Sequence, residues 1–149
     1  LEGDQAIGIQ YHFSDELGRS TNKLTQGRIM SDNEYTALEM MHMGKINKAI
    51  REYKELFDKN PMDENVSENR FNKMGYNFIS SQNLKAALAI FKLNTELYPT
   101  SSNCYDSYAE ALALMGNKHQ AIKNYRKAID LDDQAQNAKD QLKRLEENN

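Results

Sequence analysis

The sequence has few of the residues that would mark several common protein classes. It contains no tryptophan, a single cysteine and two prolines in 149 residues. One cysteine excludes an intrachain disulfide, and no apolar run approaches the roughly 18 residues that a membrane-spanning helix needs. Basic and acidic residues nearly balance, at 19 Lys and Arg against 22 Asp and Glu, so there is no charge argument for a nucleic-acid partner. We expect one domain of ordinary size that binds neither nucleic acid nor membrane.

Signals for chemistry are also scarce. No Gly-x-Ser-x-Gly nucleophile motif is present. The three histidines, His12, His42 and His119, have no partner at metal-ligand spacing. Cys104 falls in the first turn of an expected helix, where a thiol pKa can be lowered, although a buried packing role is the favoured interpretation. We therefore expect no catalytic, cofactor or metal site, and a protein that is not an enzyme.

A repeat with a period of 34 residues organises the carboxy-terminal half. Ala121 lies 34 positions after Ala87, and Tyr125 lies 34 positions after Phe91. Self-similarity at that period is typical of stacked helix–turn–helix units.

Helical periodicity extends the pattern toward the amino end, where glycine and proline separate the segments. Gly44 and Gly116 supply left-handed positions that end helices, and Asn60-Pro61 stops another. Asn117 with Gln120 is a candidate capping box. The expected helices are 31–43, 46–59, 67–81, 84–98, 102–115, 118–131 and 134–147.

The first 30 residues do not share this period. Ile7, Ile9, Tyr11 and Phe13 alternate with smaller or polar residues, which is the pattern of a strand. The chain also begins with Leu1, so we expect a processed chain or a piece of a longer one. We interpret residues 1–30 as an irregular or extended arm, or as the remnant of an upstream domain.

The repeat positions resemble those of the tetratricopeptide repeat (TPR) family. The residues that carry the resemblance are Tyr105, Tyr108, Ala109, Leu112, Ala121, Tyr125, Ala128 and Asp133 in the third unit; Phe71, Met74, Gly75, Phe78, Ala87, Phe91, Asn94 and Pro99 in the second; and Asn33, Thr36, Ala37, Met40, Ala49, Tyr53, Leu56 and Pro61 in the first. Asp133 stands where the family has proline, and the spacing between Ala49 and Ala87 is four residues longer than 34. The resemblance implies an all-α, right-handed α-solenoid at 31–149, with hairpins at about 31–63, 64–101 and 102–133 and a capping helix at 134–147.

A narrower resemblance covers residues 91–99 and 103–111. These segments are similar to the repeat tail that follows the catalytic domain of bacterial serine hydrolases of the esterase or β-lactamase type. Asn94, at a position where alanine is usual, is its distinctive residue. We expect its polar group to be buried against the next helix, near Tyr105 or Tyr108, with a hydrogen-bond partner.

In the TPR family the first helices of successive units line a concave groove that binds partner segments. Carried onto this chain, the resemblance places eight residues there: Leu38, Met41, Asn72, Tyr76, Ile79, Asp106, Glu110 and Ala113. Asp106 and Glu110 would repel a peptide's terminal carboxylate. The implied partner is a protein or peptide that offers basic or apolar side chains.

The leading functional hypothesis is a non-catalytic protein–protein interaction module, or scaffold, without a cofactor. The alternative is a carboxy-terminal accessory domain of a bacterial serine hydrolase whose catalytic domain lies outside this chain. In a third interpretation the arm adds its strand to a neighbouring chain and produces a homo-oligomer. The compartment stays open between cytoplasmic and, if the parent carries a signal peptide, extracytoplasmic.

Overall fold

The computed structural model describes residues 35–147, and this part of the chain is helical. Its elements are α1 (Ala37–His42), α2 (Ile46–Lys59), a short 3-10 helix η2 (Glu64–Val66), α3 (Glu68–Ser80), α4 (Leu84–Leu97), α5 (Ser102–Leu114), α6 (Lys118–Leu131) and α7 (Gln136–Glu147). The expected arm at 1–30, its strand, and the helix start at Ser31 or Asp32 lie outside the described residues. All the described helices belong to Ala37–Asn149, the second of the two units into which the chain divides.

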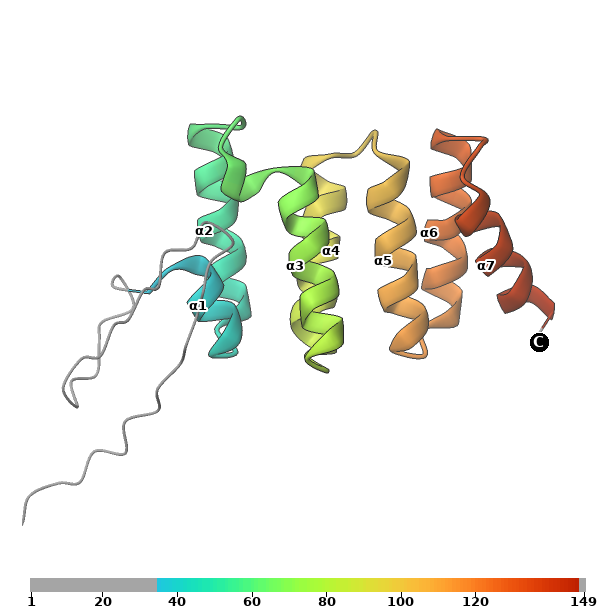
Figure 1. The fold of residues 1–149 in the computed structure, drawn as a ribbon, viewed down its shortest axis with the longest axis horizontal. Coiled ribbons are helices and arrows are strands. Elements are labelled where there is room, and N and C mark those ends of the chain that lie inside the picture. The colour runs from blue at the N-terminus through green and yellow to red at the C-terminus, as the bar shows by residue number, and fades with distance from the viewer. Residues whose placement is uncertain (1–34, 148–149) are drawn as a thin grey trace, which may run out of the picture. The chain divides into compact units, whose positions relative to one another are not determined.

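Within the second unit the helices pair as consecutive hairpins. Helix α1 packs on α2, α3 on α4, and α5 on α6, while α7 packs on α6 at the carboxy end (Figure 1). Contacts between α4 and α5 and between α3 and α5 join the second hairpin to the third. The predicted all-α architecture of three sequential hairpins and a terminal helix is confirmed.

Each hairpin turns through the same backbone motif. The second residue after the end of the helix has a positive φ, at 76° for Gly44, 59° for Gln82 and 75° for Gly116. In every case the next amide reaches back to a carbonyl five residues earlier, as in the bond from Asn83 N to Phe78 O at 2.8 Å. This is a Schellman termination, in which a left-handed residue closes the helix. Gln82 adopts that conformation in spite of its side chain.

The capping box predicted at Asn117 is wrong. The Asn117 side chain makes no capping hydrogen bond, and its backbone N–H already donates to Leu112 O at 2.9 Å in the Schellman turn. A capping box requires that same N–H as the donor to the Gln120 side chain, so the two motifs exclude one another. At the equivalent turn, Asn83 Oδ1 caps α4 by accepting from Ala86 N at 3.2 Å.

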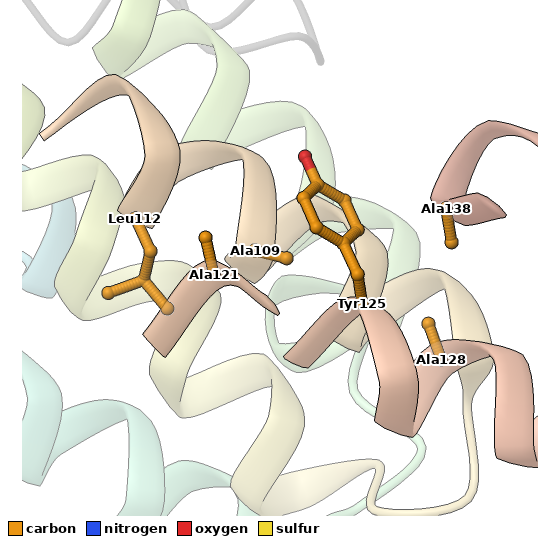
Figure 2. Close-up of a cluster of buried hydrophobic side chains, with 6 residues drawn as sticks. All are labelled: Ala109, Leu112, Ala121, Tyr125, Ala128 and Ala138. Atoms are coloured by element: carbon orange, nitrogen blue, oxygen red, sulfur yellow. The ribbon is translucent and has the colours of Figure 1, made fainter. Parts of the chain in front are cut away.

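Small residues let the paired helices approach closely. A Cβ atom built on Gly75 in α3 would lie 2.4–2.7 Å from three ring atoms of Phe91 in α4, and the Phe91 side chain is completely buried. The corresponding pair in the third hairpin is Ala109 with Tyr125. Figure 2 shows that pair within a cluster that also contains Leu112, Ala121, Ala128 and, from α7, Ala138. Helix α7 thus seals the core of the third hairpin.

Asn94 is buried and hydrogen-bonded, as expected, but its partner differs from the prediction. Its Nδ2 donates to the backbone oxygen of Glu68 at 3.1 Å, and its residue exposure is zero. The bond therefore joins α4 to the start of α3 within one hairpin and does not involve Tyr105 or Tyr108. Tyr98 makes a parallel connection by donating to Val66 O at 3.0 Å.

Candidate functional site

Helices α3, α5 and α7 occupy corresponding positions in successive repeats. Asn72 and Tyr76 in α3 lie 34 positions before Asp106 and Glu110 in α5, and Asn137 follows in α7. Residues four apart share one side of a helix, so the two pairs face the same direction. These five residues are called the α3–α5–α7 face below.

Tyr76 links α3 to α5 across this face. Its hydroxyl donates to Glu110 Oε2 at 2.8 Å and lies 3.2 Å from Ser107 Oγ. Its ring packs edge-on against Phe91, with 5.2 Å between ring centroids. Burial, together with the neighbouring carboxylate, raises the pKa of Tyr76 to about 12, so the phenol stays a neutral donor at physiological pH. The Glu110 carboxylate is thereby held in a fixed orientation.

A second α3–α5 bridge lies near the amino ends of the same helices. Glu68 Oε1 accepts a hydrogen bond from Ser101 Oγ at 2.8 Å and from Asn103 Nδ2 at 3.3 Å. Glu68 is in the first turn of α3, and Ser101 caps α5. A carboxylate close to helix amino termini is favoured by the helix dipole, so this bridge fixes how the second and third hairpins meet.

Asn72 and Asp106 lie between those two bridges and are not bonded to each other. The Oδ1 atoms of both residues are buried and have no hydrogen-bond partner among the described residues. Asp106 Oδ2 accepts from Asn137 Nδ2 in α7 at 2.7 Å. Burial raises the pKa of Asp106, the bond from Asn137 opposes that rise, and the Glu110 carboxylate adds to it. This level of the face thus has surplus hydrogen-bond acceptors.

Of the eight residues expected to bind a partner, seven are partly buried and one, Met41, is fully buried. Asn72, Tyr76, Asp106 and Glu110 come together as described, and all are partly buried. Ile79, Ala113 and Leu38 are also partly buried, the first two near the carboxy ends of α3 and α5. Met41 was expected at the surface, but its exposure is zero. Because its neighbour Met40 is equally buried, α1 is covered on two adjacent sides, and Met41 is a core residue.

Three residues of this region were missed by the sequence analysis, namely Glu68, Ser107 and Asn137. Glu68 and Ser107 bond across the hairpin boundary, which a pattern taken one repeat at a time does not reveal. Asn137 had a detectable signal, because Asn69, Asn103 and Asn137 recur at exact intervals of 34 residues. This signal was not used because the sequence analysis treated the last helix only as a cap of the repeat stack.

The remaining candidates for chemistry have structural explanations. Cys104 is buried, and burial raises its pKa to about 12, which is opposite to the activation that a helix amino terminus can give. The His42 ring packs against Phe78 in a tilted arrangement, with 5.0 Å between ring centroids. Between residues 35 and 147 no group of three or more His, Cys, Asp or Glu residues is arranged to hold a metal ion. No helix in that same stretch is long and apolar enough to cross a membrane.

Comparison with known proteins identifies similar folds but no sequence relative. No protein-family model and no curated protein sequence matches the chain. Among solved structures, a point mutant of MamA aligns with a TM-score of 0.59 at 14% identity over 75% of this chain and 79% of that one. A second MamA structure gives 0.52 at 21% identity, covering 81% and 66%.

A third solved structure is the first TPR domain of Spaghetti (RPAP3) bound to the HSP90 peptide SRMEEVD. It aligns with a TM-score of 0.51 at 18% identity over 74% of this chain and 85% of that one. Together these likenesses show that the chain has a TPR-like helical-repeat fold. None of the three is a serine hydrolase, so the narrower resemblance gains no support.

Proposed function

We propose that this protein is a non-catalytic interaction module that binds an extended protein segment along the α3–α5–α7 face. The observation that carries the proposal is the set of side chains that three successive first helices bring together there. Tyr76 supplies a rigid aromatic ring with a polar tip, and tyrosine is one of the residue types enriched among the dominant contacts of protein interfaces. Asp106 and Glu110 supply oriented acceptors. The fold itself presents a repeated surface of the kind that solenoid proteins use for recognition.

The proposed partner offers basic or apolar side chains. The RPAP3 domain with a similar fold is bound to a peptide ending in Glu-Glu-Val-Asp. On this chain Asp106 and Glu110 would face such acidic residues, and like charges disfavour binding. Near the carboxy ends of α3 and α5, the partly buried Ile79 and Ala113 offer apolar contact area to the same segment. Leu38 is a further apolar candidate, whereas the buried Met41 is not.

A displayed library of random dodecapeptides, selected on the immobilised 149-residue protein, tests the proposal without a known partner. Selected peptides should bind the wild type and lose affinity for two variants, Tyr76→Ala and Glu110→Lys. Circular dichroism of both variants establishes that they remain folded. Asp130→Asn, at an exposed position on α6, is the matched control and should bind normally. Unchanged binding by folded Tyr76→Ala and Glu110→Lys would place the interaction elsewhere.

Two other roles expected from the sequence have no observation in their favour. An accessory role beside a serine-hydrolase catalytic domain depends on the narrower resemblance, which none of the three structures named above supports. Homo-oligomer formation through the arm concerns residues 1–30, which lie outside the described part of the chain. Both stay predictions from the sequence alone.

A further inference from the structure

We infer that the α3–α5–α7 face selects its partner through a lysine or arginine side chain that binds at Asp106, and that Asn137 of α7 positions this carboxylate. The inference rests on the proposed function, because it names the chemistry of the segment bound there. It also gives α7 a role in recognition besides that of sealing the core.

The position of Asp106 follows from the bridges on either side of it. Glu68 bonds to Ser101 and Asn103 at one end of the α3–α5 contact, and Tyr76 bonds to Glu110 at the other. Asn72 in α3 and Asp106 in α5 each lie about one helical turn from both bridges, on the side of their helix that carries the bridging residues. At this level α3 and α5 each hold a buried side-chain oxygen without a donor, Asn72 Oδ1 and Asp106 Oδ1.

Charge complementarity favours a cationic occupant. Asp106 and Glu110 are one turn apart on α5, and each carboxylate is held by a neighbouring helix, through Asn137 at 2.7 Å and Tyr76 at 2.8 Å. Each of these bonds uses one of the roughly four acceptor sites of a carboxylate. Because Asp106 Oδ1 is buried and unpaired, the negative charge of this carboxylate is only partly compensated. An ammonium or guanidinium group carries several donors and no acceptor, which matches a site with surplus acceptors. Charge-assisted hydrogen bonds of this kind are the strong class.

None of the five cations on α3 and α7 is a hydrogen-bond partner of the two buried Oδ1 atoms. They are Arg70, Lys73, Lys139, Lys143 and Arg144. Lys73 follows Asn72 in α3, and Arg144 lies in α7; both are exposed, and both have interactions of their own. The negative character is therefore local to the Asp106–Glu110 turn and does not extend along the whole face.

Degenerate nonapeptide pools test this inference. Each pool is acetylated and amidated to remove terminal charge, and has Lys, Arg, Glu or Leu fixed at the centre. We expect the wild-type protein to retain the Lys and Arg pools about tenfold more strongly than the Glu pool, with a preference that declines in 0.5 M salt. Asp106→Asn should reduce the ratio to near one, while the Asp130→Asn control keeps it.

The role of Asn137 has its own readout. Asn137→Ala should reduce the preference for Lys over Leu, because the carboxylate loses its orienting donor, and Asn137→Gln should restore much of it. A purely structural role would lower retention of all pools equally and would refute the positioning role. If no pool binds at millimolar concentration, the proposed function fails as well. If pools bind equally and Asp106→Asn changes nothing, only the cation inference is overturned.

Discussion

Replacing Gly75 with alanine should destabilise the protein, although alanine is the better helix former. In a helix interior that change normally adds about 1 kcal/mol of stability. Here the new methyl group would lie 2.4 Å, 2.5 Å and 2.7 Å from three atoms of the Phe91 ring. Ordinary contacts begin near 3.4 Å, so the ring has to withdraw by about 1 Å. Phe91 has no exposed surface and packs edge-on against Tyr76, so its withdrawal has to displace neighbouring side chains.

Overpacking of this kind costs about 3 kcal/mol at the upper end of its usual range. After the gain in helix propensity is subtracted, the free energy of unfolding should fall by about 2 kcal/mol, which lowers the melting temperature by roughly 6 °C. Urea titration followed by circular dichroism measures this loss directly. Asn77→Ala, at an exposed position of the same helix, isolates the propensity effect and should be neutral or stabilising.

The double variant Gly75→Ala with Phe91→Leu locates the cause of the loss. If the ring is the obstacle, the two changes together should cost about 2 kcal/mol less than the sum of the single costs, since residues in contact couple. Stabilisation of Gly75→Ala to the level of Asn77→Ala would refute the close packing of α3 on α4.

Three further predictions concern single groups. Gln82→Gly should stabilise the protein by about 0.5–1 kcal/mol in thermal melts, because residue 82 has a φ of 59°. Gly116→Ala at the equivalent turn should destabilise it. Equal effects of the two changes would contradict the left-handed conformation at these positions. Cys104, whose pKa is raised to about 12 by burial, should resist alkylation at pH 8 until the protein unfolds, and rapid native-state labelling would show that it is accessible. Burial raises the pKa of Asp106, so its ionisation lowers the stability of the folded protein as the pH rises through the folded-state pKa. Asp106→Asn should therefore be neutral or stabilising at pH 7. This advantage should disappear below the unfolded-state pKa. A loss of stability in Asp106→Asn at pH 7 that persists in acid would show that its carboxylate is structural.

The helices were predictable because repetition and terminators locate them independently. The 34-residue period fixed the second and third hairpins, and the ends of α2, α3, α4, α5 and α6 fall within one residue of the prediction. Gly44 and Gly116 were identified as turn residues because only a residue free of side-chain strain adopts positive φ readily. Gln82 carries no such signal, so its identical conformation became visible only in the structure.

For the candidate site, the sequence indicated which side of each helix carries the residues but not which residues bond to each other. Repeat position placed Asn72, Tyr76, Asp106 and Glu110 on one side of α3 and α5. It could not show that Tyr76 and Glu110 bond to each other, because that depends on how two hairpins meet. Met41 was misplaced for a related reason: repeat position specifies a direction from the helix axis, and tertiary packing decides whether that direction is exposed.

Nuclear magnetic resonance titration of the ¹⁵N-labelled protein with a library-selected peptide tests the central claim most directly. Binding along the α3–α5–α7 face predicts that the largest amide shift changes fall in residues 72–79 and 106–113 and at Asn137. The second helices of the hairpins, α2, α4 and α6, should change little. Shift changes concentrated on α2, α4 and α6, with residues 72–79 and 106–113 unaffected, would contradict the account.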